Sequence, residues 1–122
     1  MNVGAAANVA GIETFVYDGH IPMVDLTRIE GFDWDDGNSR KSGDKHGVSQ
    51  AEAELVFLTE PLLLSEDVKH SIEEPRLHAL GQTDERRLLH ISFTLRGENR
   101  RVRVISARDM HRKERERYEE ET

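Results

Sequence analysis

Three stretches in the second half of the chain, RLHALG (residues 76–81), LLHISFTL (residues 88–95) and RRVRVIS (residues 100–106), predict the fold. Apolar and polar residues alternate in each of them, which is the period of a half-buried strand. The segments between them are short enough to be hairpin loops. We therefore expect three consecutive strands of an antiparallel sheet.

The alternation divides this sheet into an apolar face and a polar face. The apolar face should carry Leu77, Ala79, Leu89, Ile91, Phe93, Val102 and Val104. A two-residue loop before the last strand would pair Phe93 with Val102, and a five-residue loop before the middle strand would pair Leu77 with Ile91. A four-residue loop before the last strand would change these pairs but keep the faces, because side chains alternate with a period of two.

The polar face collects basic and imidazole side chains. In the predicted register Arg76, Ser92 and Arg103 share one row, and His78 and His90 lie side by side in the next. Thr94 and Arg101 lie beyond them. One polar face is normal for an antiparallel sheet, so this face is either a solvated surface or a site for an anionic ligand.

Helices are expected both before and after these strands along the chain. The first, near residues 38–45, has poor propensity and ends before Gly47, which suits a left-handed position. The next begins at a capping box of Ser49 and Glu52. Residues 62–64 are expected to form a further strand.

A last helix should follow the third strand and run to about residue 119. Ser106 is interpreted as its cap rather than as a nucleophile, since no acyl chemistry is indicated. The helix is almost wholly polar, and only Met110 and Tyr118 offer apolar anchors. Such a helix is solvated, paired along its face, or completed by a partner.

The composition indicates one small domain with a modest core. The chain has 122 residues, of which 36% are hydrophobic and 34% charged, and it has no cysteine. Disulfides and thiolate chemistry are therefore excluded. There is no stretch typical of a membrane span or a secretory signal, so the expected location is the cytoplasm.

Charge is distributed unevenly along the chain. The net charge is −7, yet residues 1–74 hold 5 basic and 15 acidic side chains, whereas residues 75–117 hold 12 basic and 6 acidic ones. The basic part contains the three strands. This polarity is compatible with an anionic ligand on the C-terminal half.

The first residues carry no motif. Residues 1–22 are expected to be an N-terminal extension that is either disordered or holds a short strand at residues 14–17. The main domain is expected to span residues 23–122, starting near Met23.

Four blocks of sequence together resemble the BrnT family of toxins. The blocks, which lie in order over roughly residues 30–120, are Phe32-Asp33-Trp34-Asp35 with Asn38; Lys45-His46-Gly47-Val48-Ser49 with Ala53 and Val56-Phe57; Arg76-Leu77-His78-Ala79-Leu80-Gly81; and Arg103-Val104-Ile105-Ser106-Ala107-Arg108 with Arg112-Lys113-Glu114-Arg115 and Tyr118-Glu119. Ser42 and Gly43 depart from the pattern, because a better helix former is expected there.

The resemblance implies a fold and a function. It implies a compact α+β domain similar to RelE and ParE, with a mainly antiparallel sheet, two N-terminal helices and a C-terminal helix. It also implies a ribonuclease that arrests translation and growth. The implied partner is a BrnA-like antitoxin with a ribbon-helix-helix domain, and operator DNA would be bound only through that antitoxin.

Candidate catalytic residues follow from the chemistry of RNA cleavage through the 2′-hydroxyl. The reaction needs a base, an acid and cations that stabilise charge on the phosphate. The candidates are Lys45, His46, Arg76, His78, Arg103 and Arg108, with His90 as a further histidine. No set of metal ligands at fixed spacing is present, so neither a metal nor a cofactor is expected.

Two other classes of function stay open at this point. The basic half could dock a partner protein or nucleic acid without cleaving it. A direct DNA-binding domain is a third interpretation, but the sequence has no helix-turn-helix signal and its first half is acidic.

Overall fold

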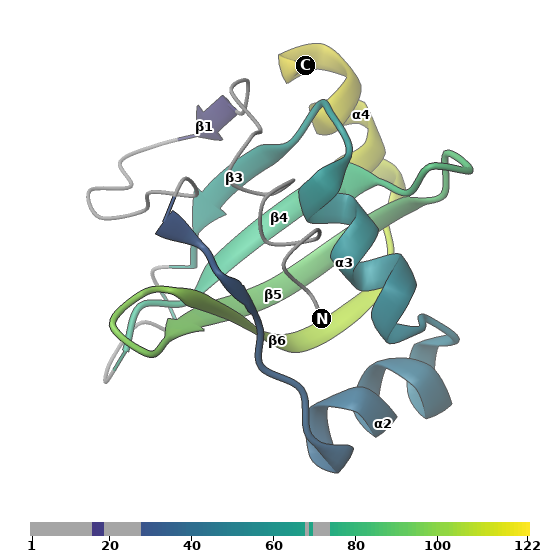
Figure 1. The fold of residues 1–122 in the computed structure, drawn as a ribbon. Coiled ribbons are helices and arrows are strands. Elements are labelled where there is room, and N and C mark those ends of the chain that lie inside the picture. The colour runs from purple at the N-terminus through teal and green to yellow at the C-terminus, as the bar shows by residue number, and fades with distance from the viewer. Residues whose placement is uncertain (1–15, 19–27, 68, 70–73) are drawn as a thin grey trace.

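A six-stranded sheet with the order β1-β3-β4-β5-β6-β2 forms the centre of the molecule (Figure 1). The computed structural model describes residues 16–18, 28–67, 69 and 74–122. The strands are β1 (Val16–Asp18), β2 (Gly31–Phe32), β3 (Leu63–Glu66), β4 (Leu77–Gln82), β5 (Leu88–Arg96) and β6 (Arg101–Asp109). The four longer strands pair antiparallel, and the short edge strands β1 and β2 run parallel to their neighbours.

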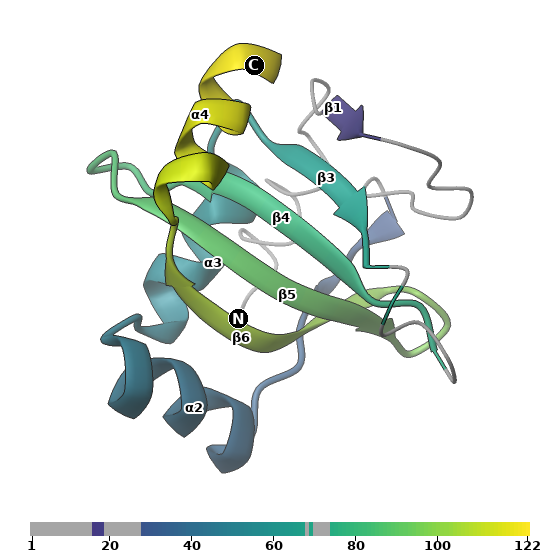
Figure 2. The ribbon, with the colours of Figure 1, turned by 180° about the vertical axis from the view of Figure 1, so that it is seen from behind.

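Helices cover both faces of the sheet. Helix α3 (Gln50–Leu58) lies on one face, α2 (Asp36–His46) packs along the β6 edge of the sheet, and α4 (Arg112–Glu121) crosses one end of the other face (Figures 1 and 2). The chain is therefore a small α+β domain with a mostly antiparallel sheet, as the sequence predicts.

The predicted end of α2 and the predicted start of α3 are confirmed, whereas α2 begins two residues earlier than expected. Asp35 caps α2 and exchanges hydrogen bonds with Asn38, while Gly47 follows the helix at φ 64°. Ser49 caps α3 in a capping box with Glu52. These local bonds satisfy backbone groups that helix ends leave unpaired, which explains how α2 forms despite its poor propensity.

The predicted apolar face of the sheet is also confirmed. All seven of its predicted residues are at most 2% exposed and belong to the main core, beneath α3. At Gly81 the sheet and α3 approach closely, since a Cβ there would lie 2.8 Å from Cγ1 of Val56. Glycine is thus required in β4 by the packing of α3.

Helix α4 is anchored by the two expected apolar residues. Met110 and Tyr118 are 8% and 5% exposed and pack with Leu63 and Leu80 in a second cluster. The Tyr118 hydroxyl donates to the carbonyl of Pro61 at 2.6 Å. The expected start of the helix is wrong, however. Ser106 is a strand residue, because β6 continues to Asp109, and His111 caps α4.

Both predicted hairpin registers are wrong by two residues. The predicted faces are still correct, because side chains alternate between the faces with a period of two. Leu77 pairs with Phe93, because the loop before β5 begins one residue later than expected. Phe93 pairs with Val104, because the loop before β6 has four residues. A bulge then shifts the register between Ser92 and Phe93.

The expected N-terminal extension contains one described element. Strand β1 pairs in parallel with β3, from Val16–Leu63 to Asp18–Ser65. The rest of residues 1–22 lies outside the described residues, so the boundary at Met23 stays a prediction.

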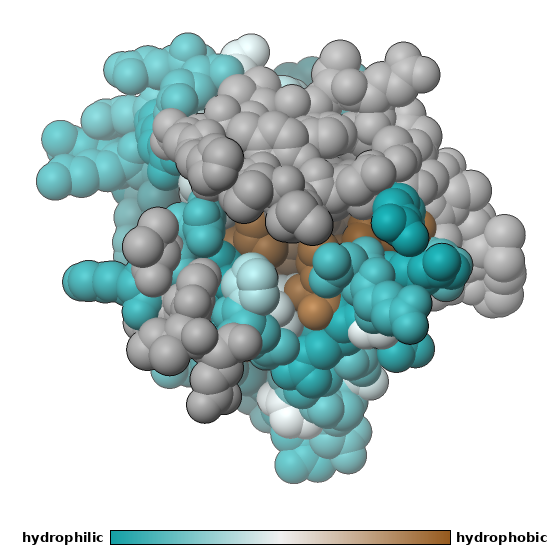
Figure 3. All heavy atoms as spheres, turned by 90° about the vertical axis from the view of Figure 1, so that its left-hand side faces the viewer, coloured by the Kyte–Doolittle hydropathy of each residue, from teal (hydrophilic) through white to brown (hydrophobic). Residues whose placement is uncertain are grey.

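On the side that is on the left in Figure 1, the surface of the described residues is mainly hydrophilic. There the described residues show only a small hydrophobic area between hydrophilic side chains (Figure 3). Within the part of the chain that the structure describes, no helix is long and apolar enough to cross a bilayer.

Candidate active site

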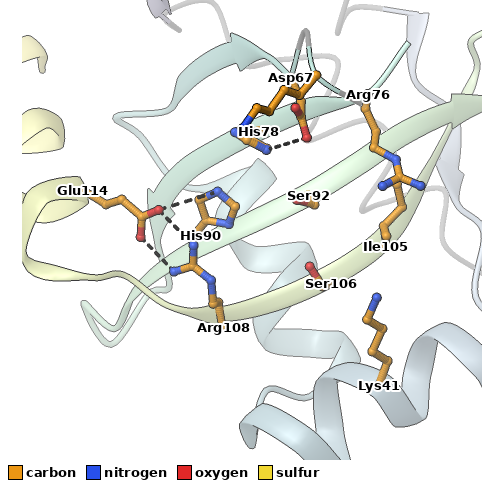
Figure 4. Close-up of a pocket in the computed structure, with 11 residues that line it drawn as sticks. Lys41, Asp67, Arg76, His78, His90, Ser92, Ile105, Ser106, Arg108 and Glu114 are labelled. Carbon is orange, nitrogen blue, oxygen red and sulfur yellow. Dashed lines mark hydrogen bonds and ion pairs between the residues drawn. The ribbon is translucent and has the colours of Figure 1, made fainter. Parts of the chain in front are cut away.

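A pocket of about 450 Å³ opens on the face of the sheet that carries α4. Strands β4, β5 and β6 form its floor, and α2 and α4 contribute side chains from two sides (Figure 4). It is lined by Lys41, Asp67, Lys69, Arg76, His78, His90, Ser92, Ile105, Ser106, Arg108 and Glu114. The predicted polar face of the sheet is thus the floor of a charged pocket rather than a plain solvated surface.

One row of the sheet crosses the middle of this floor. His78 lies opposite Ser92, and Ser92 lies opposite Ser106. The predicted row of Arg76, Ser92 and Arg103 is wrong, because Arg103 pairs with Thr94 instead. The bulge leaves Ile105 without a partner in β5, and Ile105 and Ser106 both line the pocket.

His78 is held by a carboxylate at the edge of the pocket. Its Nε2 lies 3.1 Å from Oδ2 of Asp67, and the two side chains are 32% and 11% exposed. An ionised carboxylate can only accept a hydrogen bond, so Nε2 carries the hydrogen, and in the neutral imidazole Nδ1 is then the nitrogen with the lone pair. This arrangement leaves one imidazole nitrogen able to accept a proton.

His90 lies near His78, but the predicted row that joins them is wrong, because His90 pairs with Leu80 and His78 with Ser92. The environment of His90 also differs from that of His78. The two rings are 4.7 Å apart between centroids. Burial, followed by the charge of Arg108, lowers the pKa of His90 to about 4, and Glu114 opposes this only in part. His90 is therefore neutral near pH 7 and brings no charge next to His78.

Arg108 and Glu114 form a two-bonded ion pair on the α4 side of the pocket. Nη1 and Nη2 of Arg108 donate to the two carboxylate oxygens of Glu114 at 2.8 and 2.9 Å (Figure 4). Burial alone would raise the pKa of Glu114, but the bonds from Arg108 and the His111 N–H lower it to about 2. Glu114 is thus a stable anion and a weak base.

Three of the six candidate catalytic residues come together in the pocket: Arg76, His78 and Arg108. The other three do not line it. Arg103 donates to Oδ2 of Asp35 at 2.9 Å, at the start of α2, and is only 22% exposed, so it does not point into open solvent. Lys45 and His46 lie in the last turn of α2, where His46 is close to Asp109.

Sequence reasoning missed four charged residues of the pocket, Lys41, Asp67, Lys69 and Glu114, and also Ile105 and Ser106. Glu114 had a usable signal, since it stands three residues after His111 in a capping-box position and bonds the His111 N–H. Asp67 continues the antiparallel pairing of β3 and β4, because its N–H donates to the carbonyl of Arg76. Lys41 had no signal of its own, because its place depends on how α2 docks.

The arrangement can bind a phosphate and transfer a proton. Arginine and lysine side chains come from separate elements, and a hydrogen-bonded imidazole lines the same pocket. Cations stabilise negative charge that develops on a phosphate, and imidazole exchanges protons near neutral pH. Among the described residues, no group of three or more histidine, aspartate or glutamate side chains is placed to hold a metal ion.

The fold and this pocket define a small α+β protein equipped to act on a phosphate-containing ligand. A family model described as the ribonuclease toxin BrnT of a type II toxin–antitoxin system matches residues 34–114. The chain therefore belongs to the BrnT family. No curated protein matches the chain. Membership makes it a ribonuclease toxin of a type II toxin–antitoxin system, with RNA as the substrate class and a protein antitoxin as the partner.

Proposed function

We propose that the pocket on the α4 face is the site at which this protein cleaves RNA. The observation behind this proposal is that Arg76 and Lys41 line the same pocket as His78. His78 belongs to the row His78–Ser92–Ser106 on the pocket floor. The ion pair of Arg108 with Glu114 borders the site. Lys45, His46 and Arg103 are not part of it.

In the proposed reaction Nδ1 of His78 accepts the proton of the 2′-hydroxyl. The 2′-oxygen then attacks the phosphorus, and the bond from phosphorus to the 5′-oxygen breaks. The leaving oxygen takes a proton from the imidazolium, directly or through a water molecule, which returns His78 to its neutral form. The products are a 2′,3′-cyclic phosphate and a 5′-hydroxyl, so all atoms and protons are accounted for.

The cations of the pocket supply the charge stabilisation. Arg76 and Lys41 would contact the non-bridging oxygens, whose negative charge increases in the transition state. Ser92 and Ser106, on the floor of the pocket, can donate hydrogen bonds from their hydroxyls. Because these side chains provide the positive charge, we propose that no divalent ion is required.

The experiment is an RNA cleavage assay with the purified chain in the presence of a chelator. We expect cleavage of single-stranded RNA, a 2′,3′-cyclic phosphate end, and no reaction where the 2′-hydroxyl is replaced by hydrogen. The His78→Gln variant should lose most of the activity. The control variant His111→Gln should keep it, because the His111 side chain is exposed and does not line the pocket. Strict dependence on a divalent ion, or binding of RNA without cleavage, would refute the mechanism.

We further propose that a BrnA-like ribbon-helix-helix antitoxin covers the pocket and α4, in the cytoplasm, and that the toxin reaches operator DNA only through it. The net charge of +6 over residues 75–117 supports an acidic or amphipathic partner segment. Such a complex should stop both RNA cleavage and growth arrest. Simultaneous binding of RNA and antitoxin at the pocket would contradict this. The mostly antiparallel sheet supports the proposed relation to RelE and ParE, whereas the arrangement of the helices differs.

A further inference from the structure

Two buried polar side chains attach α2 to β6. Asn38 and Ser42, one helical turn apart, are 6% and 1% exposed. Nδ2 of Asn38 donates to the carbonyl of Val104 at 2.8 Å, and Oγ of Ser42 accepts the N–H of Ala107 at 3.0 Å. Buried polar groups are retained only where their hydrogen bonds are made, so this contact fixes the position of α2.

The two bonded backbone groups lie on either side of the bulge in β6. Strand β2 covers the outer edge of β6 only at Arg101 and Val102. Beyond it, the N–H of Asp33 reaches the carbonyl of Val102 at 2.8 Å. Further along β6, side chains of α2 bind the backbone at this edge. They satisfy strand groups that a bulged edge would otherwise leave unpaired.

The same contact positions one wall of the pocket. Lys41 precedes Ser42 in α2, and its side chain extends into the pocket towards Ile105 and Ser106 (Figure 4). Ile105 and Ser106 are the bulge residues enclosed between the two attachment points. Any shift of α2 along β6 would therefore move Lys41 relative to the row that carries His78.

We propose that Asn38 and Ser42 are positioning residues of the ribonuclease site, which hold Lys41 against the bulged part of β6. The inference rests on the proposed function and adds residues that do not line the pocket themselves. It explains why Ser42, a poor helix former, stands in the middle of α2. A better helix former such as alanine would leave the N–H of Ala107 without its acceptor.

The test is a double-mutant cycle on RNA cleavage with Ser42→Ala and Lys41→Met. Each single variant should lower kcat by on the order of tenfold, since small displacements of a contacting group are costly. In the Lys41→Met background, Ser42→Ala should have little further effect. If Ser42→Ala instead acted by unfolding the protein, it would remove active molecules whether or not Lys41 is present. The effects of the two substitutions on the activation free energy would then add.

Matched controls lie on the same helix. Ser39→Ala removes a hydroxyl that bonds Nε2 of Gln50 in α3 rather than β6, so it should leave kcat unchanged. Arg40→Met removes an exposed charge outside the pocket and should do the same. If Ser42→Ala does not fold, Ser42→Cys keeps the volume with a weaker acceptor and enters the cycle in its place.

The outcomes separate the two claims. A wild-type chain that does not cleave RNA overturns the proposed function and this inference with it. A wild-type chain that cleaves RNA, with additive effects of Ser42→Ala and Lys41→Met, overturns the positioning role alone. An effect of Ser42→Ala that largely disappears in the Lys41→Met background supports it.

Discussion

Replacing His90 with leucine should reduce the loss of stability that acid causes in this protein. His90 is 7% exposed, and burial with Arg108 nearby lowers its pKa to about 4. In the unfolded chain the ordinary value of 6.5 applies. Between these two pH values the unfolded state binds more protons, so the free energy of unfolding falls as the pH falls.

The size of the effect follows from the two pKa values. Across the whole window the linkage amounts to about 3 kcal/mol, of which about 2 kcal/mol lies between pH 7 and pH 5. Glu114 adds a separate loss at lower pH, because its pKa of about 2 lies below the ordinary 4.5. Measurements between pH 7 and pH 5 therefore report mainly on His90.

The assay is urea unfolding at pH 7, 6 and 5 for wild type, His90→Leu and His111→Leu. The free energy of unfolding should fall by about 2 kcal/mol less for His90→Leu than for wild type. The control His111→Leu, whose side chain is 72% exposed, should follow the wild type. Equal pH dependence of wild type and His90→Leu would show that His90 is not buried as a neutral side chain.

Two further substitutions test the packing that holds the site. Gly81→Ala should lower the free energy of unfolding by about 1–3 kcal/mol, because the new Cβ would lie 2.8 Å from Val56; thermal or urea unfolding measures this, and an unchanged stability would contradict the close contact of α3 and β4. Arg87→Ala should cost about 1–2 kcal/mol, since Arg87 bonds Asp109 through two nitrogens and Glu52 through a third contact at the surface. Adding 1 M salt should shrink the difference between Arg87→Ala and wild type, and a loss that is insensitive to salt would point to another cause.

The sequence predicted what depends on local pattern. Alternation identified the buried face from Leu77 to Val104, and capping chemistry identified the start of α3 at Ser49. Met110 and Tyr118 were recognised as the anchors of the last helix. These features depend on neighbouring residues, which a single sequence displays directly.

What the sequence could not predict depends on long-range geometry. Loop lengths set the hairpin registers, and the four-residue loop before β6 pairs Arg103 with Thr94 instead of Ser92. The extension of β6 through Ser106 placed Arg108 at the end of a strand opposite His90. The position of Lys41 follows only from the docking of α2, and no local pattern encodes that contact.

The most direct test of the pocket as the ribonuclease site compares two arginines on the same face of the sheet. Arg76 lines the pocket, whereas Arg103 bonds Asp35 outside it. Single-turnover cleavage of RNA should be measured for Arg76→Met and Arg103→Met, corrected for the folded fraction. The account predicts that Arg76→Met loses at least about tenfold in rate and that Arg103→Met stays close to wild type. Loss of cleavage with Arg103→Met and full activity with Arg76→Met would place the active site elsewhere.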